Sequence, residues 1–538
     1  MMIRPADFGN YGPFMIRQAW HCAGSYRSWD GRGGCDGARQ RFEPERSWDD
    51  NTNLDKSKTL LWPIKQKYGL GLSWGDLITL TGTTAIESMG GPMFGFCAGR
   101  IDDEDGSDSV ELGPNAEQQR LAPCPVNGEC KSPLGATTIG LIYVNPEGPM
   151  GQPVPLASAL EVRDTFARMG MNDAETVALI GGGHAFGKAH GACPLGPGLP
   201  PDRDPAHPWV SPCPNGTFTS GFEGSWTTTP TQWSNNYFHE LLGYEWEAVT
   251  GPGNHTQWRV KGGGPPKVMM LTSDMGLLHD PAGIYQQWLK AYRDNVTLFD
   301  EAFGRAWYKL MTRDMGPVSR CVGPDVPPAQ PWQFPLPPAP TPEQLPDFAE
   351  VRTAVAVAMR TAVADLTPDY VREAGGGRAP TYLGVLVQLA WQCASTLRST
   401  DFQGGCNGAR IRFAPESDWP ENAAMDRAVG LLRPVYAAFQ RAGWALSWAD
   451  LIVFAGQVAL EQAGAAPLRF CPRRTDASDG SGSQNLQPML NYSAGVRISL
   501  CIHTYILYIL IFFTYLYMYI FVRFQTHAPL LIHMYTYT

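Results

Sequence analysis

Charged residues are scarce in this chain of 538 residues, in which Asp, Glu, Lys and Arg make up 17%, against about a quarter in ordinary globular proteins. The 42 basic residues form no block and the formal net charge is −9, so the sequence does not predict nucleic-acid binding. The low charge, with 58 Gly and 46 Pro, also argues against a coiled coil or a highly charged disordered protein. The length predicts several domain-sized units.

Closely spaced metal-binding cysteines are also missing. The 12 cysteines include no CxxC pair, which argues against a structural zinc site. We expect reduced thiols and an intracellular, cytoplasmic location, because this cysteine density is far below that of a disulfide scaffold. A disulfide between Cys124 and Cys130 is left open, and Cys193 and Cys213 are open as a disulfide or as free thiols. The N-terminus, MMIRPADFGNYGPF, has no apolar run typical of a signal peptide.

The last forty residues differ from the rest of the chain. Residues 499–538 contain no Gly, Asp or Glu, and residues 500–524 are apolar and Tyr-rich. This stretch is long enough to span a bilayer, so one hypothesis is a membrane anchor. The other, which we favour, is translated intron or untranslated sequence, because the change in composition is abrupt and cuts a domain short.

An internal duplication sets the expected architecture. Residues 19–51 match residues 390–422 at a constant offset of 371, and residues 71–82 match residues 445–456 at an offset of 374. Two long matches with one small shift indicate two homologous domains. The expected divisions are a first copy at 1–322, a Pro-rich extended linker at 323–347, a truncated second copy at 348–485 and the anomalous tail at 486–538.

The pattern is mainly helical, and one helix carries an unusual set of side chains. We expect helices at 14–27, 74–89, 156–169, 172–180, 236–247 and 299–313. In the first of these, Arg17, Trp20 and His21 share one face. Histidine can take and return a proton near neutral pH, and arginine can stabilise a developing negative charge. The alternative is a packed Trp–His pair beside a surface Arg. The second copy keeps the tryptophan but has Gln388 and Gln392 in place of Arg17 and His21, as expected if only one copy is active.

A second candidate is the segment GGGHAFGKAHG at 181–191. It lacks the spacing of a phosphate-binding loop. A histidine in such a glycine-rich turn is a candidate ligand of a metal or heme, or merely a turn residue. Spacing alone does not choose between His184 and His190.

Together these segments resemble the catalase-peroxidases, which are class I heme peroxidases. The resemblance covers about residues 5–323, and the duplication is a family trait. The matching stretches are IRQAWHCAGSYR, DGRGG, SWDDN, LLWPIKQKYG, LSWGDLI, LIYVNPEGP, MGMNDAETVALIGGGHAFGKAHG, TSGFEGSW, TPTQW, GYEWE and WYKLMTRDMGP. The resemblance implies an all-α, duplicated heme peroxidase fold with heme b in the first copy. It also implies a bifunctional enzyme of peroxide detoxification, which disproportionates hydrogen peroxide and oxidises small organic electron donors through a ferryl intermediate.

On the distal side of the heme, the resemblance makes His21 the base that moves a proton between the two oxygens of peroxide. Arg17 would stabilise the leaving oxygen, and Asn51 would hold His21 by a hydrogen bond. Asp50 would lie at the mouth of the substrate channel.

On the proximal side, the resemblance makes His184 the axial ligand of the heme iron. Asp274 would accept a hydrogen bond from its other nitrogen and make the imidazole more basic. Trp226 would pack at the proximal face of the ring.

Four residues bear on the catalase activity of the family. A covalent adduct of Trp20, Tyr143 and Met169, with Arg313 as a mobile partner of the tyrosine phenolate, implies that both activities are present. The resemblance also implies a homodimer, although the family's N-terminal extension has no counterpart here, and a membrane enters only if the tail is real. If the truncated second copy fails to support the site, the chain is a peroxidase only or an inactive heme-binding remnant.

Overall fold

The computed structural model describes residues 7–110, 112, 144–213, 220–361, 363, 366–372 and 378–487. Tyr143, the Cys124–Cys130 pair and nearly all of the tail at 486–538 lie outside these residues. Met1–Gln487 cluster as one compact unit. Within it, each copy has its own hydrophobic core. The predicted domain divisions stay predictions.

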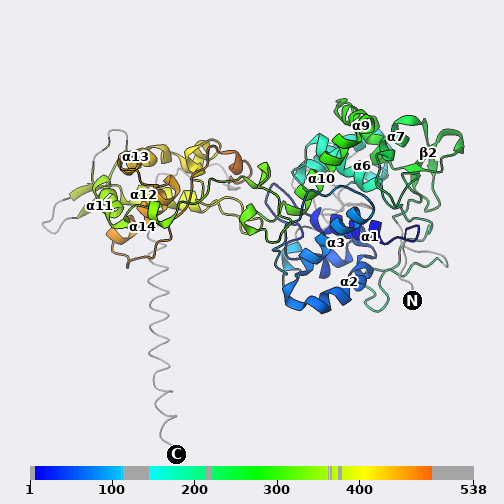
Figure 1. Ribbon diagram of the computed structural model, residues 1–538, viewed down its shortest axis with the longest axis horizontal. Helices are drawn as coiled ribbons and strands as arrows, with labels where there is room; N and C mark the ends of the chain where they lie inside the picture. Colours follow the sequence, from blue (N-terminus) through cyan, green and yellow to red (C-terminus); the bar gives the residue numbers. More distant parts are fainter. Residues whose placement is uncertain are drawn as a thin grey trace, which may run out of the picture. The chain divides into compact units, whose positions relative to one another are not determined.

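Helices form most of the regular structure, which confirms the all-α class (Figure 1). In the first copy they are α1 (Gly12–Ala23), α2 (Leu54–Tyr68), α3 (Trp74–Ser88), α5 (Pro155–Arg168), α6 (Asp173–His184), α7 (Asn236–Gly243), α8 (Thr272–Leu278), α9 (Ile284–Asp294) and α10 (Val296–Thr312). In the second copy they are α11 (Phe348–Ala358), α12 (Leu383–Ala394), α13 (Met425–Arg441) and α14 (Trp448–Gln462).

Among the described residues, two small antiparallel sheets accompany the helices. One has the order β1 (Trp246–Thr250), β2 (Thr256–Val260), β3 (Met269–Met270), and the other pairs β4 (Asp369–Arg372) with β5 (Arg378–Thr381). The helix expected at 236–247 therefore ends early, at Gly243. Trp246 instead begins a strand paired in register with Val260, so ladder hydrogen bonds take the place of helical ones there.

Each copy contains the same close helix crossing. In the first copy α1 packs against α3, and a Cβ added to Gly82 would lie 2.4 Å from the Cβ of Ala19. In the second copy α12 packs against α14, and a Cβ added to Gly456 would lie 2.3 Å from the Cβ of Ala390. Only glycine allows the two backbones to approach this closely. The duplication seen in the sequence is therefore also a duplication of packing.

The Pro-rich linker is held at several points by the chain on either side. The indole of Trp332 donates to the Thr312 hydroxyl at the end of α10, over 3.4 Å. Arg410, in the second copy, donates to the carbonyl of Phe334 over 3.3 Å. Short 3₁₀ turns at Pro331–Gln333 and Pro342–Gln344 interrupt the extended backbone. The linker is thus held by side chains on both sides, and short turns interrupt its extended backbone.

The second copy contacts the segment that follows α1. The hydroxyl of Tyr26 donates to Asp401 over 2.8 Å, and both side chains are buried. Arg398 binds the same carboxylate through Nε over 3.0 Å and also donates to the carbonyl of Trp29. The Tyr26–Asp401 and Arg398–Trp29 bonds connect residues 375 and 369 positions apart in the sequence.

The structure corrects the expectation of reduced thiols. Within the part of the chain that the structure describes, disulfides join Cys22 to Cys35, Cys97 to Cys321, Cys193 to Cys213, and Cys393 to Cys406. Disulfides are typical of oxidising compartments. The first and last pairs occupy equivalent positions in the two copies, both 13 residues apart. Among the described residues, Cys471 is a free, exposed thiol.

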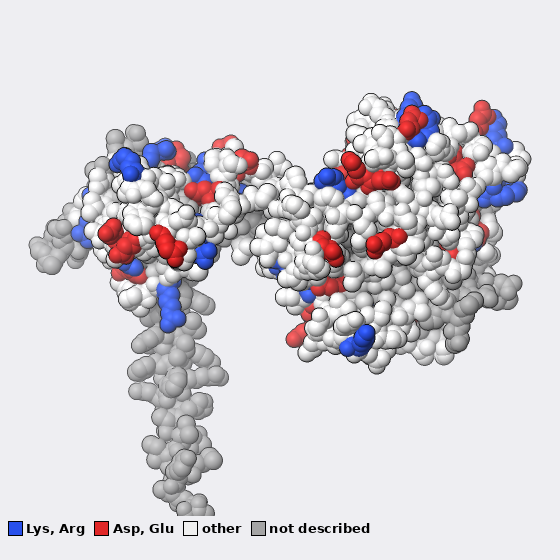
Figure 2. All heavy atoms as spheres, in the orientation of Figure 1, with Lys and Arg blue, Asp and Glu red and all other residues white. Residues whose placement is uncertain are grey.

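The surface reflects the low charge of the sequence. On the face shown in Figure 2, most described side chains are uncharged. The acidic and basic side chains form small clusters that lie side by side. No helix among the described residues has both the length and the apolar character needed to cross a bilayer.

Candidate functional site

The face of α1 presents Arg17, Trp20 and His21 to a cavity. Pro13 lies in the first turn of the helix, where its missing N–H leaves no bond unmade. The spacing of the three residues then places them on one side of the helix, as expected from the sequence. The structure therefore brings together the three candidate residues of this segment.

The imidazole of His21 is fixed by a chain of hydrogen bonds. Asn51 Nδ2 donates to the carbonyl of Glu45 over 2.7 Å, so the Asn51 Oδ1 faces His21 Nδ1 at 3.1 Å. Because that oxygen can only accept, Nδ1 of His21 carries the proton and Nε2 is left as the basic nitrogen. Burial and the positive charge of Arg17 hold the pKa of His21 well below its usual value, against the opposing bond to Asn51. His21 is thus a neutral base with a defined tautomer.

The guanidinium of Arg17 is held by backbone. Its Nη1 donates to the carbonyl of Thr52 over 3.0 Å, and its Nη2 to the carbonyl of Asp50 over 2.7 Å. Burial lowers the pKa of Arg17 to about 10, although Asp50 and Asp7 oppose the shift. Arg17 therefore stays charged at neutral pH and keeps a fixed position beside His21.

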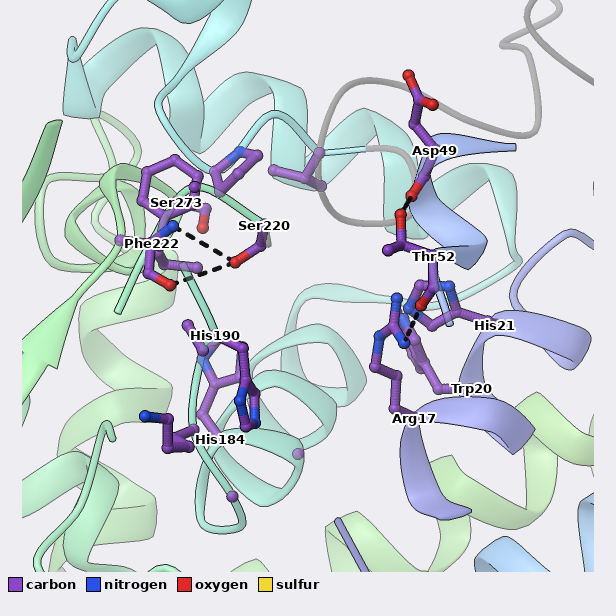
Figure 3. A pocket seen from close by; sticks show the side chains of 18 of the residues that line it. Arg17, Trp20, His21, Asp49, Thr52, His184, His190, Ser220, Phe222 and Ser273 are labelled. Carbon is purple, nitrogen blue, oxygen red and sulfur yellow. Dashed lines mark hydrogen bonds between the residues drawn. The ribbon is translucent and has the colours of Figure 1, made fainter. Parts of the chain in front are cut away.

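His184 ends α6, across the cavity from α1 (Figure 3). The helix begins with the expected cap at Asn172, whose side chain accepts from the Glu175 N–H over 2.9 Å. It then runs four residues beyond the predicted end at residue 180. A Cβ on Gly181 or Gly182 would lie within 2.3 Å of an aromatic ring of α7 or α10, so the glycines allow close helix packing. His184 therefore lies at a helix terminus, not in the glycine-rich turn expected from the sequence.

The Nδ1 of His184 is bound by a buried carboxylate. It lies 2.8 Å from Oδ1 of Asp274, and the indole of Trp226 donates to Oδ2 of the same carboxylate over 3.0 Å. The rings of His184 and Trp226 stack with centroids 4.1 Å apart. Burial raises the pKa of Asp274, but the charge and hydrogen bonds of His184 and a hydrogen bond from Tyr237 outweigh it, so the net shift is downward. An ionised Asp274 can only accept, so Nδ1–H of His184 donates and Nε2 is free to bind a metal.

His190, the competing histidine, has a different environment. Its Nε2 lies 2.6 Å from Oδ1 of Asp7. A nitrogen engaged by a carboxylate in this way is less suited to bind iron than the Nε2 of His184. The geometry therefore distinguishes two histidines that spacing did not.

The cavity between these two groups has a volume of about 680 Å³. This is within the range of roughly 300–1,000 Å³ for sites that hold sizeable organic ligands. Apolar residues that line it are Val144, Leu179, Ile180, Phe186, Trp226 and Leu271. Gly183 also lines it, and a Cβ there would meet no atom within 4 Å, so the end of α6 opens onto free space.

The other candidate residues have varied positions. Met169 is fully buried just after α5, and Arg313, just after α10, lies with its guanidinium carbon 5.2 Å from the centre of the Tyr26 ring. Tyr143, the third member of the expected adduct, lies outside the described residues. Asp50 is fully buried, whereas its neighbour Asp49 is exposed and lines the cavity. Asp50 is not among the residues that line this cavity, and its expected place at a channel mouth stays a prediction.

Two buried polar residues near the site were missed from the sequence. Tyr237 of α7 donates to Asp274 over 2.7 Å. Glu161 of α5 is buried, and burial raises its pKa to about 8, against a hydrogen bond from the Asn145 backbone. On a helix with apolar periodicity, a tyrosine is typical of the core and a glutamate is typical of the surface. No sequence pattern therefore indicates that Tyr237 and Glu161 lie near the site.

The second copy repeats the hydrogen-bond framework around α1 without the histidine. Asn422 donates to the carbonyl of Glu416 over 2.7 Å, just as Asn51 does to Glu45. Gln392, at the position of His21, donates to a backbone carbonyl instead. Trp391, at the position of Trp20, is 65% exposed.

Comparison with known proteins places the chain in a family. The family model described as peroxidase matches residues 4–295 and 360–496. A protein named catalase-peroxidase from Pseudomonas putida (strain W619) is 44% identical over 541 aligned residues, which cover 88% of this chain and 68% of the relative. Another from Burkholderia mallei (strain SAVP1) is 45% identical over 516, which cover 88% and 67%. The chain therefore belongs to the catalase-peroxidases, heme-dependent oxidoreductases that act on hydrogen peroxide.

Proposed function

We propose that this chain is a bifunctional catalase-peroxidase that detoxifies hydrogen peroxide. It would disproportionate peroxide to water and oxygen and would also oxidise small organic electron donors. The observation that carries the proposal is the single cavity that has a free histidine nitrogen on one side, at His184, and a neutral base with a fixed cation, His21 and Arg17, on the other.

The residues present fit one heme b in the first copy. The cavity is apolar on several sides and open beside Gly183, and an anionic carboxylate orients the imidazole of His184 as in other histidine metal sites. His184 would hold the heme iron through Nε2, with Trp226 stacked against the imidazole ring. When bound, heme supplies a redox-active iron that exchanges electrons with peroxide and with donors.

The residues on the distal side would transfer protons and stabilise negative charge. His21 accepts a proton from peroxide at Nε2, since Nδ1 already carries one and donates to Asn51, and it returns the proton to the departing oxygen. Arg17 stabilises the negative charge on that oxygen, because two carbonyls hold its guanidinium in place before the reaction. Such general acid–base transfer contributes about a hundred- to ten-thousand-fold to a rate.

The catalase activity rests on a second group of residues. Trp20 lines the cavity, and Met169 is buried next to α5. Their presence with Tyr143 and Arg313 in the sequence supports a covalent adduct of Trp20, Tyr143 and Met169. In this proposal Arg313 pairs with the tyrosine and assists the oxidation of a second peroxide to oxygen. The two electrons and two protons that this peroxide loses would reduce the oxygen atom left by the first peroxide to water, so that two peroxides give two waters and one oxygen.

The test compares heme binding, oxygen release and donor oxidation in four proteins. His184→Ala should lose the axial histidine in the absorption spectrum, while His190→Ala should keep it. His21→Gln, the residue already present in the second copy, should keep heme but react with peroxide at least a hundredfold more slowly. Donor oxidation without oxygen release in the unaltered chain would identify a peroxidase only, and heme binding without either activity would identify an inactive remnant.

A further inference from the structure

We propose that Tyr237 is a positioning residue for the reaction, and that its hydrogen bond to Asp274 limits how much negative charge Asp274 shares with His184. Tyr237 would thereby lower the electron donation of His184 to the iron. This inference rests on the proposed role of His184 as the axial ligand.

Four donors meet the carboxylate of Asp274. Oδ1 receives Nδ1–H of His184 over 2.8 Å and the hydroxyl of Tyr237 over 2.7 Å. Oδ2 receives the indole of Trp226 over 3.0 Å and the backbone N–H of Leu271 over 2.8 Å. A carboxylate has about four lone-pair sites, so its acceptor capacity is full. His184 and Tyr237 therefore compete for the charge of one oxygen.

The position of Tyr237 is fixed by its surroundings. It lies on α7 and is fully buried. Its ring meets that of His184 edge to face, with centroids 5.7 Å apart, and that of Phe238 at 5.4 Å. Because the ring is packed on these sides, the hydroxyl cannot swing to another acceptor. The bond to Asp274 is thus a permanent part of the site.

The consequence follows from how hydrogen bonds share charge. A hydrogen bond from a hydroxyl to an ionised carboxylate is a strong, charge-assisted bond. Each donor that Asp274 accepts draws its negative charge away from Nδ1–H of His184. A weaker pull on that proton leaves the imidazole less anionic, and second-shell bonds of this kind tune a metal ligand. Without the hydroxyl, His184 would become more anionic and would stabilise ferric over ferrous iron.

A purely structural role for the hydroxyl predicts something different. A buried tyrosine needs a partner for its O–H, and the loss of that bond would change stability alone. Two measurements distinguish the explanations: the reduction potential of the heme and the iron–histidine stretching frequency of the ferrous form. Neither quantity depends on the global stability of the protein.

The experiment uses the full heme-loaded chain with Tyr237→Phe, which keeps the ring and removes the hydroxyl. Tyr292→Phe is the matched control, since Tyr292 is also buried and its hydroxyl donates to the carbonyl of Ala174, away from Asp274. We expect Tyr237→Phe to shift the ferric/ferrous equilibrium about tenfold toward ferric, a fall of about 59 mV for this one-electron couple. The iron–histidine stretch should rise in frequency, and Tyr292→Phe should move neither quantity.

A second variant should shift the reduction potential and the iron–histidine stretch in the opposite directions. Incorporation of 3-fluorotyrosine at position 237 makes the hydroxyl a stronger donor, so the potential should rise and the stretch should fall. If neither variant differs from Tyr292→Phe, or if both move the potential in the same direction, the inference is wrong while the proposed function stands. If the unaltered chain binds no heme, the proposed function fails, and this inference fails with it.

Discussion

Removal of the carboxylate of Asp401 tests whether the second copy stabilises the first copy. Asp401 accepts from the Tyr26 hydroxyl over 2.8 Å and from Arg398 Nε over 3.0 Å. Asp401→Ala leaves both donors without this acceptor. Tyr26→Phe removes only the hydroxyl. The two variants and their combination form a double-mutant cycle across the contact between the copies.

The structure allows the size of the effect to be estimated. A buried hydrogen bond to a charged group contributes about 1.5–3 kcal/mol, so Tyr26→Phe should lower the free energy of unfolding by about 2 kcal/mol. Breaking a buried ion pair costs roughly 3–5 kcal/mol. Arg398 keeps its bonds to backbone carbonyls and its side chain is 16% exposed. Asp401→Ala should therefore lower the free energy of unfolding by about 3 kcal/mol, at the lower end of that range.

The assay is urea unfolding of the heme-loaded chain, followed by tryptophan fluorescence. Because the two residues share one bond, the double variant should be less destabilised than the sum of the single variants, by about 1–2 kcal/mol. Asp418→Ala, an exposed acid of the second copy, should change little. Oxygen release should also fall in Asp401→Ala, since Tyr26 lies against Arg313. Strict additivity in the cycle would refute the reasoning.

Three further outcomes follow from the site and its surroundings. Arg17→Leu should raise the pKa of His21, because a nearby positive charge is lost. The pH below which the reaction with peroxide slows should therefore rise, and an unchanged pH profile would contradict this. Glu161, with a folded pKa of about 8 against 4.5, keeps a proton that the unfolded chain releases, so stability falls as pH rises from about 4.5 to 8. Glu161→Gln should flatten that slope in unfolding measured at pH 5 and pH 8. The double variant Cys97→Ser and Cys321→Ser should lose about 2–4 kcal/mol in denaturant unfolding, and equal stability would show that the disulfide does not constrain the unfolded chain.

The distal helix could be predicted from the sequence because its information is local. Arg17, Trp20 and His21 follow helical spacing, and the helix at 12–23 presents them together. The cap at Asn172 is equally local and is also as expected. Such features depend on the preferences of a few neighbouring residues, which the sequence displays directly.

The proximal side shows why other features could not be predicted. Three consecutive glycines suggested a turn before His184, yet they lie within α6, where rings of Phe238 and Phe303 leave no room for a Cβ on Gly181 or Gly182. Those rings come from helices more than fifty residues further along the chain. The disulfide from Cys97 to Cys321 spans 224 positions, so spacing alone does not reveal it. In both cases the deciding contact is tertiary.

The repeated crossing of α1 with α3 and of α12 with α14 makes the second copy an internal reference. A change such as Gly82→Ala alters both the scaffold and the cavity, because α1 carries His21. The same change at Gly456 meets nearly the same steric conflict with α12, which has Gln392 at the position of His21. If Gly82→Ala and Gly456→Ala destabilise the chain equally, the difference in their oxygen release measures how strongly the reaction depends on the position of α1. The comparison is made within one molecule and needs no separate control protein.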